Sequence, residues 1–347
     1  MNKYIMIFLV LLFMTKDFYA RTNTGTTVAN FLEIGMGSRV TAMGNAGAAI
    51  SKDLFSMYWN PAGLSFVNYN TFSVMNLPWV SDININYISL GVPVQNVGTF
   101  GISITSLSMN DMNVTTLEYQ EGTGQTFTSS DINFSLGFGR NITDWFAFGF
   151  TTNYIYEKIY MMSASAFSVN LGVHINTYFF SPTGDRKDGM EIGMSISNFG
   201  TKMQLSGLNT LIPADINPNE DGNNDRIKSF LGTDPWPLPL YYRVGFVLHP
   251  IVSEKHKLNF ACDAVHPNNN TEFINLGTEY IFSPNRFFDL ALRAGYASLF
   301  KKNSEEGLTF GAGLKFSYGK LSFSFDYSYN NLNRLRYVHR YTFNIFM

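Results

Sequence analysis

The sequence contains little charge. Of its 347 residues, 24 are Lys or Arg and 26 are Asp or Glu, so charged residues make up 14%, against roughly 25% in a typical soluble domain. The two signs nearly balance, which removes the electrostatic case for binding nucleic acid or an anionic membrane surface. Aromatic residues reach 16%. A chain with few charges and many aromatic side chains is expected to have an apolar exterior.

Cysteine and long apolar runs are also scarce. Cys262 is the only cysteine, which excludes an intramolecular disulfide framework, a cysteine zinc site and a lipid-modified cysteine near the N-terminus. Lys3, the apolar run 4–14 and Ala20 predict a secretory signal peptide over residues 1–20. No stretch approaches the ~20 apolar residues that a spanning helix needs. The sequence therefore excludes a helical membrane protein.

The rest of the chain alternates apolar with small polar residues. Phe134, Leu136 and Phe138 are separated by Ser135 and Gly137, and segments 165–179 and 320–329 repeat this pattern. Such alternation is typical of strands with one apolar and one polar face. It predicts fourteen strands, at 69–77, 84–94, 98–108, 130–140, 145–158, 165–179, 189–199, 240–249, 256–265, 273–282, 287–298, 307–318, 320–329 and 337–347.

The composition of the polar face favours a barrel in lipid. A soluble sandwich would carry many Lys and Glu residues on its outer face. Here that face is Gly, Ser, Asn and Thr, with scattered Asp263, Glu279, Arg293 and Lys315. A membrane barrel turns large apolar side chains outward and small polar ones inward, and it must close because lipid cannot satisfy a free strand edge. The predicted fold class is an all-β, 14-stranded antiparallel transmembrane β-barrel.

Loop lengths predict its orientation. Connections after even-numbered strands are mostly short, as at 95–97, 141–144, 283–286 and 319, whereas those after odd-numbered strands include 109–129 and 200–239. Outer-membrane barrels have short periplasmic turns and longer external loops. The pattern predicts an integral barrel in a Gram-negative-type outer membrane, with both chain ends periplasmic and membrane lipid around its wall.

One short segment does not alternate. In DLFSMYWNPAGL, residues 53–64, Asp53 is placed to cap a short helix, which must stop by Asn60 because that residue precedes a proline. The residue types of Asn60–Gly63 favour a type I turn. Residues 35–50, which include Gly44, are rich in Gly and Ala and allow close packing. We therefore expect residues 21–66 to fold into the lumen as a hatch and residues 67–347 to form the barrel.

These residues carry a resemblance to a known family. Gly37-Ser-Arg-Val-Thr-Ala-Met-Gly-Asn-Ala46, then Asp53, then Asn60-Pro-Ala-Gly-Leu64 resemble the N-terminal signature of the PorV/PorQ outer-membrane proteins, relatives of FadL-type barrels. Segments 275–280, 292–296, 308–314 and 338–343 resemble the closing strands of that family. The resemblance departs from the family at Met347, where an aromatic residue is usual, and in the 200–239 loop.

The resemblance implies both a fold and two functions. The implied fold is a FadL-like, 14-stranded barrel with a hatch, and the implied role is in type IX secretion, as a shuttle that binds cargo or translocon proteins. FadL-like relatives instead pass hydrophobic small molecules, so uptake of such a ligand is the alternative function. The hatch motif consists of Arg39, Gly44, Asp53, Asn60, Pro61, Ala62 and Gly63.

Two features of the expected site remain open. Arg39 and Asp53 are expected to pair with one another or with a lumen charge such as Glu279 or Arg293, either as a latch for the hatch or as simple satisfaction of buried charge. Segment Pro235-Trp236-Pro237-Leu238-Pro239 is stiff and apolar. A loop of this kind is expected either to bind a partner protein or to pack across the barrel opening.

The remaining motifs predict no chemistry. Asn217–Asp225 has oxygen ligands at alternate positions, but Lys228 takes the place of the acid that would complete a calcium loop, which favours a solvated loop. The histidines lack metal spacing, and His174 is expected to line the lumen. We find no catalytic motif and predict a non-enzymatic protein without a cofactor. Aromatic residues near strand ends fit interface girdles: Trp145, Tyr160, Tyr178, Tyr296, Tyr318 and Tyr337.

Overall fold

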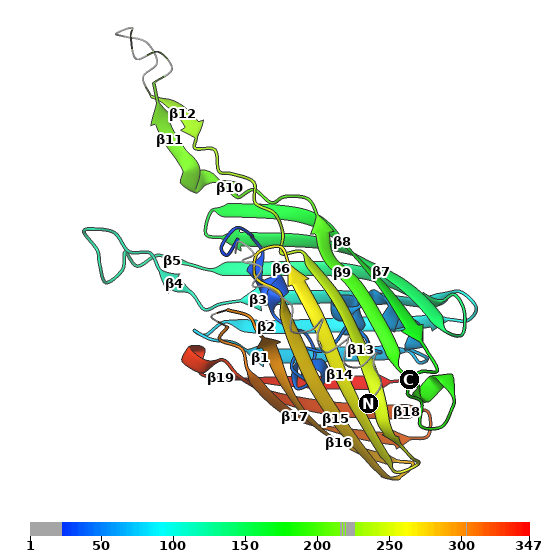
Figure 1. The fold of residues 1–347 in the computed structure, drawn as a ribbon. Coiled ribbons are helices and arrows are strands. Elements are labelled where there is room, and N and C mark those ends of the chain that lie inside the picture. Colours follow the sequence, from blue (N-terminus) through cyan, green and yellow to red (C-terminus); the bar gives the residue numbers. More distant parts are fainter. Residues whose placement is uncertain (1–22, 216, 218, 220–225, 303) are drawn as a thin grey trace.

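The computed structural model describes residues 23–347 except 216, 218, 220–225 and 303. Its main feature is a ring of fourteen long antiparallel strands, which closes where β1 pairs with β19 and where β8 pairs with β9 (Figure 1). The strands are β1 (Thr71–Pro78), β2 (Asn84–Val94), β3 (Gly98–Ser108), β6 (Ser129–Asn141), β7 (Phe146–Ile159), β8 (Met162–Asn176), β9 (Glu191–Gly200), β13 (Tyr241–Val252), β14 (His256–Pro267), β15 (Phe273–Asn285), β16 (Phe288–Leu299), β17 (Leu308–Tyr318), β18 (Leu321–Asn331) and β19 (Tyr337–Phe346).

The predicted barrel is confirmed strand for strand. Most boundaries agree within two or three residues, and β8 is displaced toward the N-terminus. It begins at Met162 rather than at residue 165, because only Tyr160 and Met161 separate the paired residues Ile159 and Met162. Tyr160 has a positive φ of 52°, a conformation that lets the chain reverse within two residues. The alternating pattern alone does not reveal so tight a turn.

The two faces of the ring follow the alternation in the sequence. On β3, the side chains of Phe100, Ile102 and Ile104 are exposed on the outside, whereas Ser103 and Thr105 are buried on the inside. The outer face is therefore apolar along the strands and the inner face is small and polar, as a barrel in lipid requires. Of the predicted girdle residues, Tyr160 is partly buried and the others are exposed: Trp145, Tyr178, Tyr296, Tyr318 and Tyr337.

The two ends of the barrel differ. One end, the short-turn end, carries tight turns such as 95–97, 253–255 and 319–320. The other, the long-loop end, carries the connections 109–128 and 201–240. Both long connections contain small hairpins that project from the barrel, β4 (Met112–Asn113) with β5 (Thr126–Phe127), and β11 (Leu211–Ala214) with β12 (Ile227–Phe230) (Figure 1). Two-residue β10 (Ser206–Gly207) pairs with the start of β8.

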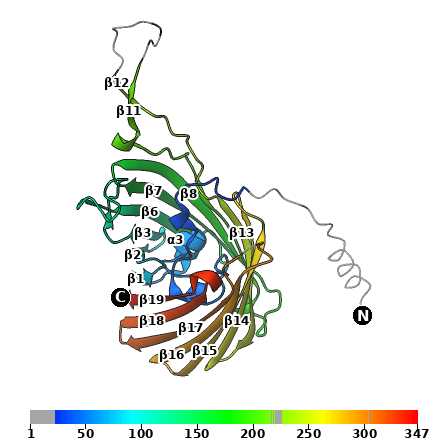
Figure 2. The same ribbon diagram turned by 90° about the vertical axis from the view of Figure 1, so that its left-hand side faces the viewer.

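Residues 28–67, which we call the inserted segment, lie inside the ring (Figure 2). They contain four short helices: η1 (Asn30–Glu33), α2 (Ser38–Thr41), α3 (Ser56–Trp59) and η2 (Pro61–Phe66). Most of their apolar side chains are buried, among them Met43 and Leu54. Across the described part of the chain, no helix has both the length and the apolar character needed to cross a membrane. The small inward-facing residues of the strands leave the space that the inserted segment fills.

The inserted segment runs through the barrel from one end to the other. At the long-loop end, the Val28 amide donates to the Pro237 carbonyl, and at the short-turn end the Thr99 hydroxyl donates to the Val67 carbonyl. Residue 71 of β1 pairs with residue 346 of β19, so the barrel strands begin and end at the short-turn end. Residues 23–28 nevertheless lie at the opposite end. The prediction that both chain ends share one side is therefore not supported, and the predicted signal peptide, residues 1–20, lies outside the described residues.

Candidate functional site

A chain of ion pairs, buried except for the partly exposed Arg39 side chain, connects the inserted segment to the barrel wall. Arg39 on α2 donates from Nε and Nη2 to the two carboxylate oxygens of Glu279 on β15, at 2.9 and 2.8 Å. Arg293 on β16 donates to the same carboxylate at 2.8 Å and to Asp326 on β18 at 2.7 Å. Two-point contacts between a guanidinium and a carboxylate fix orientation as well as position. Arg39 therefore holds α2 against three strands through this network.

Asp53 was expected to pair with Arg39 or with a lumen charge, but its carboxylate binds the backbone of its own segment. Its carboxylate accepts a hydrogen bond from the Phe55 amide at 3.0 Å, one residue before α3 begins. Burial raises the pKa of Asp53 above its ordinary value, and the Arg39 charge opposes that rise. Of the pairings expected for Arg39, the structure contains the one with Glu279. Asp53 therefore orders the turn before α3 and does not cap the helix as expected, because the N-cap position of α3 is Phe55 and receives no side-chain hydrogen bond.

The Asn60–Gly63 segment forms a close contact with the wall. The Asn60 side chain donates to the carbonyls of Ala48 and Val173, at 2.6 and 2.9 Å, and accepts from the Ala62 amide at 3.2 Å. α3 ends at Trp59, as the proline at position 61 requires, and the Gly63 amide donates to the Asn60 carbonyl at 2.9 Å. This bond closes the predicted turn, which continues as η2. Asn60 thus links both halves of the inserted segment to β8.

Glycine is required at two places where the backbone of the inserted segment approaches the backbone of a barrel strand. Gly44 has a φ of +63°, and a Cβ there would lie 2.5 Å from the Leu276 carbonyl oxygen and 2.6 Å from the Tyr296 amide nitrogen. A Cβ on Gly149 of β7 would overlap the Pro61 carbonyl. Only a residue without a side chain allows such an approach. Gly44 belongs to the predicted hatch motif, whereas Gly149 comes from the wall.

A second group of charges lies nearer the short-turn end. Lys52 Nζ is 2.5 Å from a carboxylate oxygen of Glu191 at the start of β9, and the ring nitrogens of His174 and His249 lie 3.3 and 3.1 Å from the same carboxylate. His174 is buried inside the barrel. No local sequence pattern marks Glu191 or His249 as members of this group. The strand register could have placed Glu191 on the inner face, but not opposite Lys52.

Segment Pro235–Pro239 packs across the long-loop end. The backbone of Trp236 exchanges two hydrogen bonds with Met203, at 2.8 and 2.9 Å, and Leu238 is buried among residues of the inserted segment and the wall. Asn268 donates to the Leu238 carbonyl at 3.0 Å. The Trp236 side chain remains partly exposed. The segment thus contacts the inserted segment and the wall while one aromatic ring stays accessible from outside, and its role as a partner-binding loop stays a prediction.

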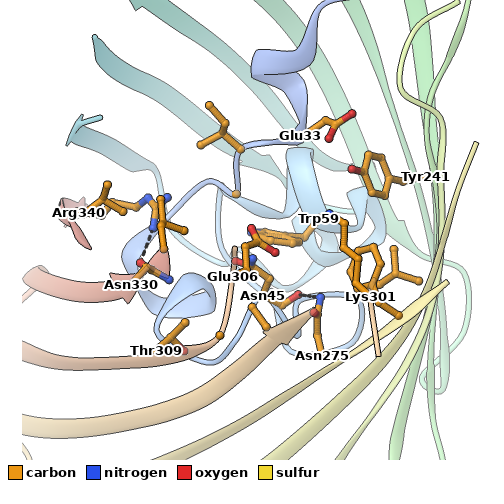
Figure 3. Close-up of a pocket in the computed structure, with 18 of the residues that line it drawn as sticks. Glu33, Asn45, Trp59, Tyr241, Asn275, Lys301, Glu306, Thr309, Asn330 and Arg340 are labelled. Atoms are coloured by element: carbon orange, nitrogen blue, oxygen red, sulfur yellow. Dashed lines mark hydrogen bonds between the residues drawn. The ribbon is translucent and has the colours of Figure 1, made fainter. Parts of the chain in front are cut away.

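A cavity of about 220 Å³ lies between the inserted segment and the strands, near the long-loop end (Figure 3). Its walls combine aromatic rings, amides and charges, and include Tyr58 and Trp59 of α3. The Tyr58 hydroxyl donates to the Leu32 carbonyl at 3.0 Å, and burial raises the pKa of Tyr58 to about 12. The charged residues of the lining are Glu33, Arg243, Lys301, Glu306 and Arg340. None of these five was predicted as a site residue from the sequence.

The structure also bears on the segments that were considered as metal or calcium sites. Among the described residues, no three His, Cys, Asp or Glu side chains are grouped as metal ligands would be. Most of the loop 217–225, considered as a calcium site, lies outside the described residues. Cys262 is a free thiol on β14. The polar groups that the structure brings together are therefore the ion pairs of the inserted segment and the lining of the cavity.

A family model described as "Type IX secretion system protein PorV" matches residues 18–219, which is more than half of the chain. The comparison with curated protein sequences gives no match. This match includes the whole inserted segment and the first seven barrel strands.

Solved structures with a similar fold include two bacterial toluene transporters and a hydrocarbon channel. TodX of P. putida has a TM-score of 0.56 and 12% identity over 90% of this chain and 96% of its own. TbuX of Ralstonia pickettii has a TM-score of 0.53 and 12% identity over 90% and 97%. CymD, a monoaromatic hydrocarbon channel, has a TM-score of 0.52 and 11% identity over 90% and 96%. At such low identity these similarities establish the fold.

Proposed function

The chain belongs to the PorV family of type IX secretion system proteins, and on this premise we propose that it serves protein secretion or cell-surface attachment. The protein is an outer-membrane barrel, and in this proposal it acts without catalysis, by binding a cargo or translocon protein. The observation that carries the proposal is the family match itself. The geometry of the lumen and of the long loops adds independent support.

The lumen supports a role that needs a sealed barrel. The inserted segment is held to β15 by Arg39, to β8 by Asn60 and to β19 by Ser38, whose amide donates to the Thr342 hydroxyl at 2.9 Å. Moving it would break ion pairs that are buried and would leave single charges in the barrel interior, which is costly. A protein that binds partners at its outer end has no need of that movement.

The long-loop end supports partner binding. The β11–β12 hairpin projects beyond the ring (Figure 2) and leaves large apolar side chains exposed. Exposed apolar surface of this kind often marks a contact with another protein. We place this end on the cell exterior and the short-turn end in the periplasm, following the loop lengths usual in outer-membrane barrels. The exposed side chains of the hairpin and its base are Leu208, Leu211, Ile212, Phe230 and Leu231.

A second function, uptake of a hydrophobic small molecule, rests on the likeness of the fold to TodX and TbuX, which are titled toluene transporters. Transport of this kind would require an apolar route and an inserted segment that moves. The charged side chains in the mixed lining of the cavity weigh against a purely apolar ligand.

The test is a pull-down of tagged protein from its native outer membrane in mild detergent. Bound proteins and extracted small molecules are both identified by mass spectrometry. We expect partner proteins, and we expect to lose them when residues 208–231 are replaced by two glycines. Thr233 and Leu205 are joined by a side-chain hydrogen bond, so the ends of this deletion lie close together.

The matched control removes the other projecting hairpin. Val114 and Gln125 are joined by a backbone hydrogen bond, so residues 115–124 can be replaced by a short turn without disturbing the ring. This control variant is expected to retain the partners. A preparation that carries a stoichiometric apolar small molecule and no partner protein would refute the secretion role and favour uptake.

A further inference from the structure

A second cavity, of about 230 Å³, lies at the short-turn end of the barrel. Its polar lining comes from the inserted segment, from β9, β13 and β14, and from η3 (Arg186–Asp188), a short helix in the connection from β8 to β9. Positive groups outnumber negative ones in this lining. Its ionisable side chains are Arg39, Lys52, Lys187, Asp188, Glu191, His249 and Lys257.

A continuous chain of hydrogen bonds connects the two cations that the inserted segment contributes. Lys52 binds Glu191, and the same carboxylate oxygen lies 3.1 Å from His249 Nε2. His249 Nδ1 lies 2.7 Å from Asn259 Oδ1, and the Asn259 amide donates at 2.9 Å to the carboxylate that Arg39 binds. Lys52 and Arg39 are therefore held by one network, and both line the same cavity.

Two lysines of the wall lie beside this network. Lys257 is two residues before Asn259 on β14, so the two side chains point to the same face of the strand, about 7 Å apart. Lys187 belongs to η3, which lies against β13. Both lysine side chains are exposed. They form the rim of the cavity, whereas Lys52 and Arg39 lie deeper.

The acidic groups balance only part of the positive charge. Arg39 belongs to the network of two arginines and two carboxylates described above, which is neutral as a group. Lys52 and its carboxylate partner are neutral as a pair. The remaining acid of the lining is Asp188, which faces two lysines, Lys187 and Lys257. Neither lysine forms an ion pair in the described part of the chain, so one positive charge is left over.

His249 adds a second positive charge. Its Nε2 faces the Glu191 carboxylate, and its Nδ1 faces Asn259 Oδ1, whose orientation is fixed because the amide nitrogen donates to Glu279. A histidine satisfies two acceptors only when both ring nitrogens carry a proton. His174, on the far side of Glu191, contacts this carboxylate through Nε2 alone. The excess in the cavity is therefore about two positive charges.

The deeper cations keep donors free for a ligand. Arg39 donates to Glu279 from Nε and Nη2, and its Nη1 makes no hydrogen bond within the described residues. The Lys52 ammonium has three donors and uses one of them on its carboxylate partner. Their side chains are 26% and 31% exposed. Carboxylates thus hold both cations in place without occupying all of their donors.

We infer that this cavity is a binding site for a phosphate group. A phosphate ester carries nearly two negative charges and three acceptor oxygens at neutral pH, which match the excess charge and the free donors. Arginine and lysine are the side chains that usually bind phosphate. The apolar side chains of Ile50, Val252 and Ile281 complete the lining and leave room for a short organic group. The inference concerns the isolated barrel and does not depend on the secretion role.

The test measures binding to the purified full-length protein by isothermal titration calorimetry in a phosphate-free buffer. The probes are inorganic phosphate, glycerol 3-phosphate, acetate and glycerophosphoglycerol, which is the headgroup of phosphatidylglycerol without its acyl chains. We expect saturable binding of phosphate and at least tenfold weaker binding of acetate. Tighter binding of glycerol 3-phosphate would assign the site to a soluble ester, and tighter binding of glycerophosphoglycerol would assign it to a lipid headgroup.

Variants at the rim locate the binding without disturbing the buried network. Lys187→Gln and Lys257→Gln are each expected to weaken phosphate binding at least threefold, and the double variant at least tenfold. The matched control is Lys320→Gln, because Lys320 is exposed in a tight turn at the same end and lies outside the cavity. No saturable binding of phosphate, equal binding of acetate, or unchanged binding in the double variant would overturn the inference.

A second measurement uses the native sequence. An N-hydroxysuccinimide ester of acetic acid acylates accessible lysines, and mass spectrometry maps the modified positions. Phosphate should slow modification of Lys187 and Lys257 at least threefold, whereas chloride at equal ionic strength should not. Lys320 should react equally throughout. Lack of protection by phosphate would refute the site.

Discussion

Glu279 accepts hydrogen bonds from Arg39 of the inserted segment and from Arg293 of the wall. Replacing it with glutamine keeps the shape of the side chain and removes the charge shared by two arginines. We predict that Glu279→Gln lowers the free energy of unfolding by ~3–5 kcal/mol, as loss of one member of a buried ion pair does. The measurement is denaturant unfolding in detergent, followed by tryptophan fluorescence.

Glu272→Gln is the control for this prediction. Glu272 forms a similar contact with His266, but both side chains are more than half exposed, and an exposed pair contributes at most about 1 kcal/mol. Equal stability of the Glu279 variant and this control would show that the buried network does not hold the inserted segment.

A substitution at Gly44 tests how tightly the backbone of the inserted segment packs against the backbones of β15 and β16. An added Cβ would meet backbone atoms of Leu276 and Tyr296, which cannot move away as a flexible side chain can. We predict that Gly44→Ala loosens the inserted segment and makes it sensitive to limited proteolysis.

Gly25→Ala separates this crowding from conformational strain. Gly25 also has a positive φ, +81°, but a Cβ there would meet nothing within 4 Å. Left-handed strain alone costs an alanine about 1–2 kcal/mol. If both variants resist protease equally, crowding at Gly44 is not important.

The inserted segment is one element whose mobility separates the two candidate functions. The hydroxyl oxygens of Ser38 and Thr342 lie 2.8 Å apart, so cysteines at these positions are placed to form a disulfide between α2 and β19. In a Cys262→Ala background, we predict that this cross-link leaves partner capture unchanged. Pull-downs from oxidised and reduced membranes provide the comparison.

An uptake function gives the opposite expectation. A transporter must move the segment, so the cross-link would block accumulation of a labelled apolar compound in whole cells, and a reductant would restore it. Loss of partner capture in the oxidised form alone would show that the segment moves in the secretion role as well.

At the level of the whole molecule, the orientation of the barrel can be tested directly. Leu117, in the 109–128 connection, is 95% exposed, and Asp144 lies in an exposed turn at the opposite end. In the Cys262→Ala background, we predict that a membrane-impermeant maleimide labels Leu117→Cys in intact cells and labels Asp144→Cys only after the outer membrane is opened. The reverse pattern would place the long loops in the periplasm.

Much of this architecture follows from short-range patterns. Alternation along each strand predicts the number of strands and their faces, since lipid outside and small polar groups inside leave few alternatives. The proline at position 61 predicts where α3 ends. The position of residues 23–28 could not be predicted in this way, because loop parity describes the strands and not a segment that passes through them.

The pairings of the site are less predictable for a related reason. Arg39 and Glu279 are separated by 240 positions, and no local pattern distinguishes Glu279 from Asp53 as the partner. The same is true of Arg243 and Arg340, which come from β13 and β19 and line one cavity. Strand register places such residues on the inner face, but only the closed ring shows which of them meet.

The path of the inserted segment has a consequence for how the barrel is assembled. Ser38, Arg39 and Thr41 near the N-terminus make their contacts with β15, β18 and β19, which are the last parts of the chain to be synthesised. Contacts over such sequence distances form late and slowly. Since the segment fills the ring and is attached on several sides, the ring is expected to close around it. In this order of assembly, β1 and β19 pair only after the inserted segment has taken its place inside the ring.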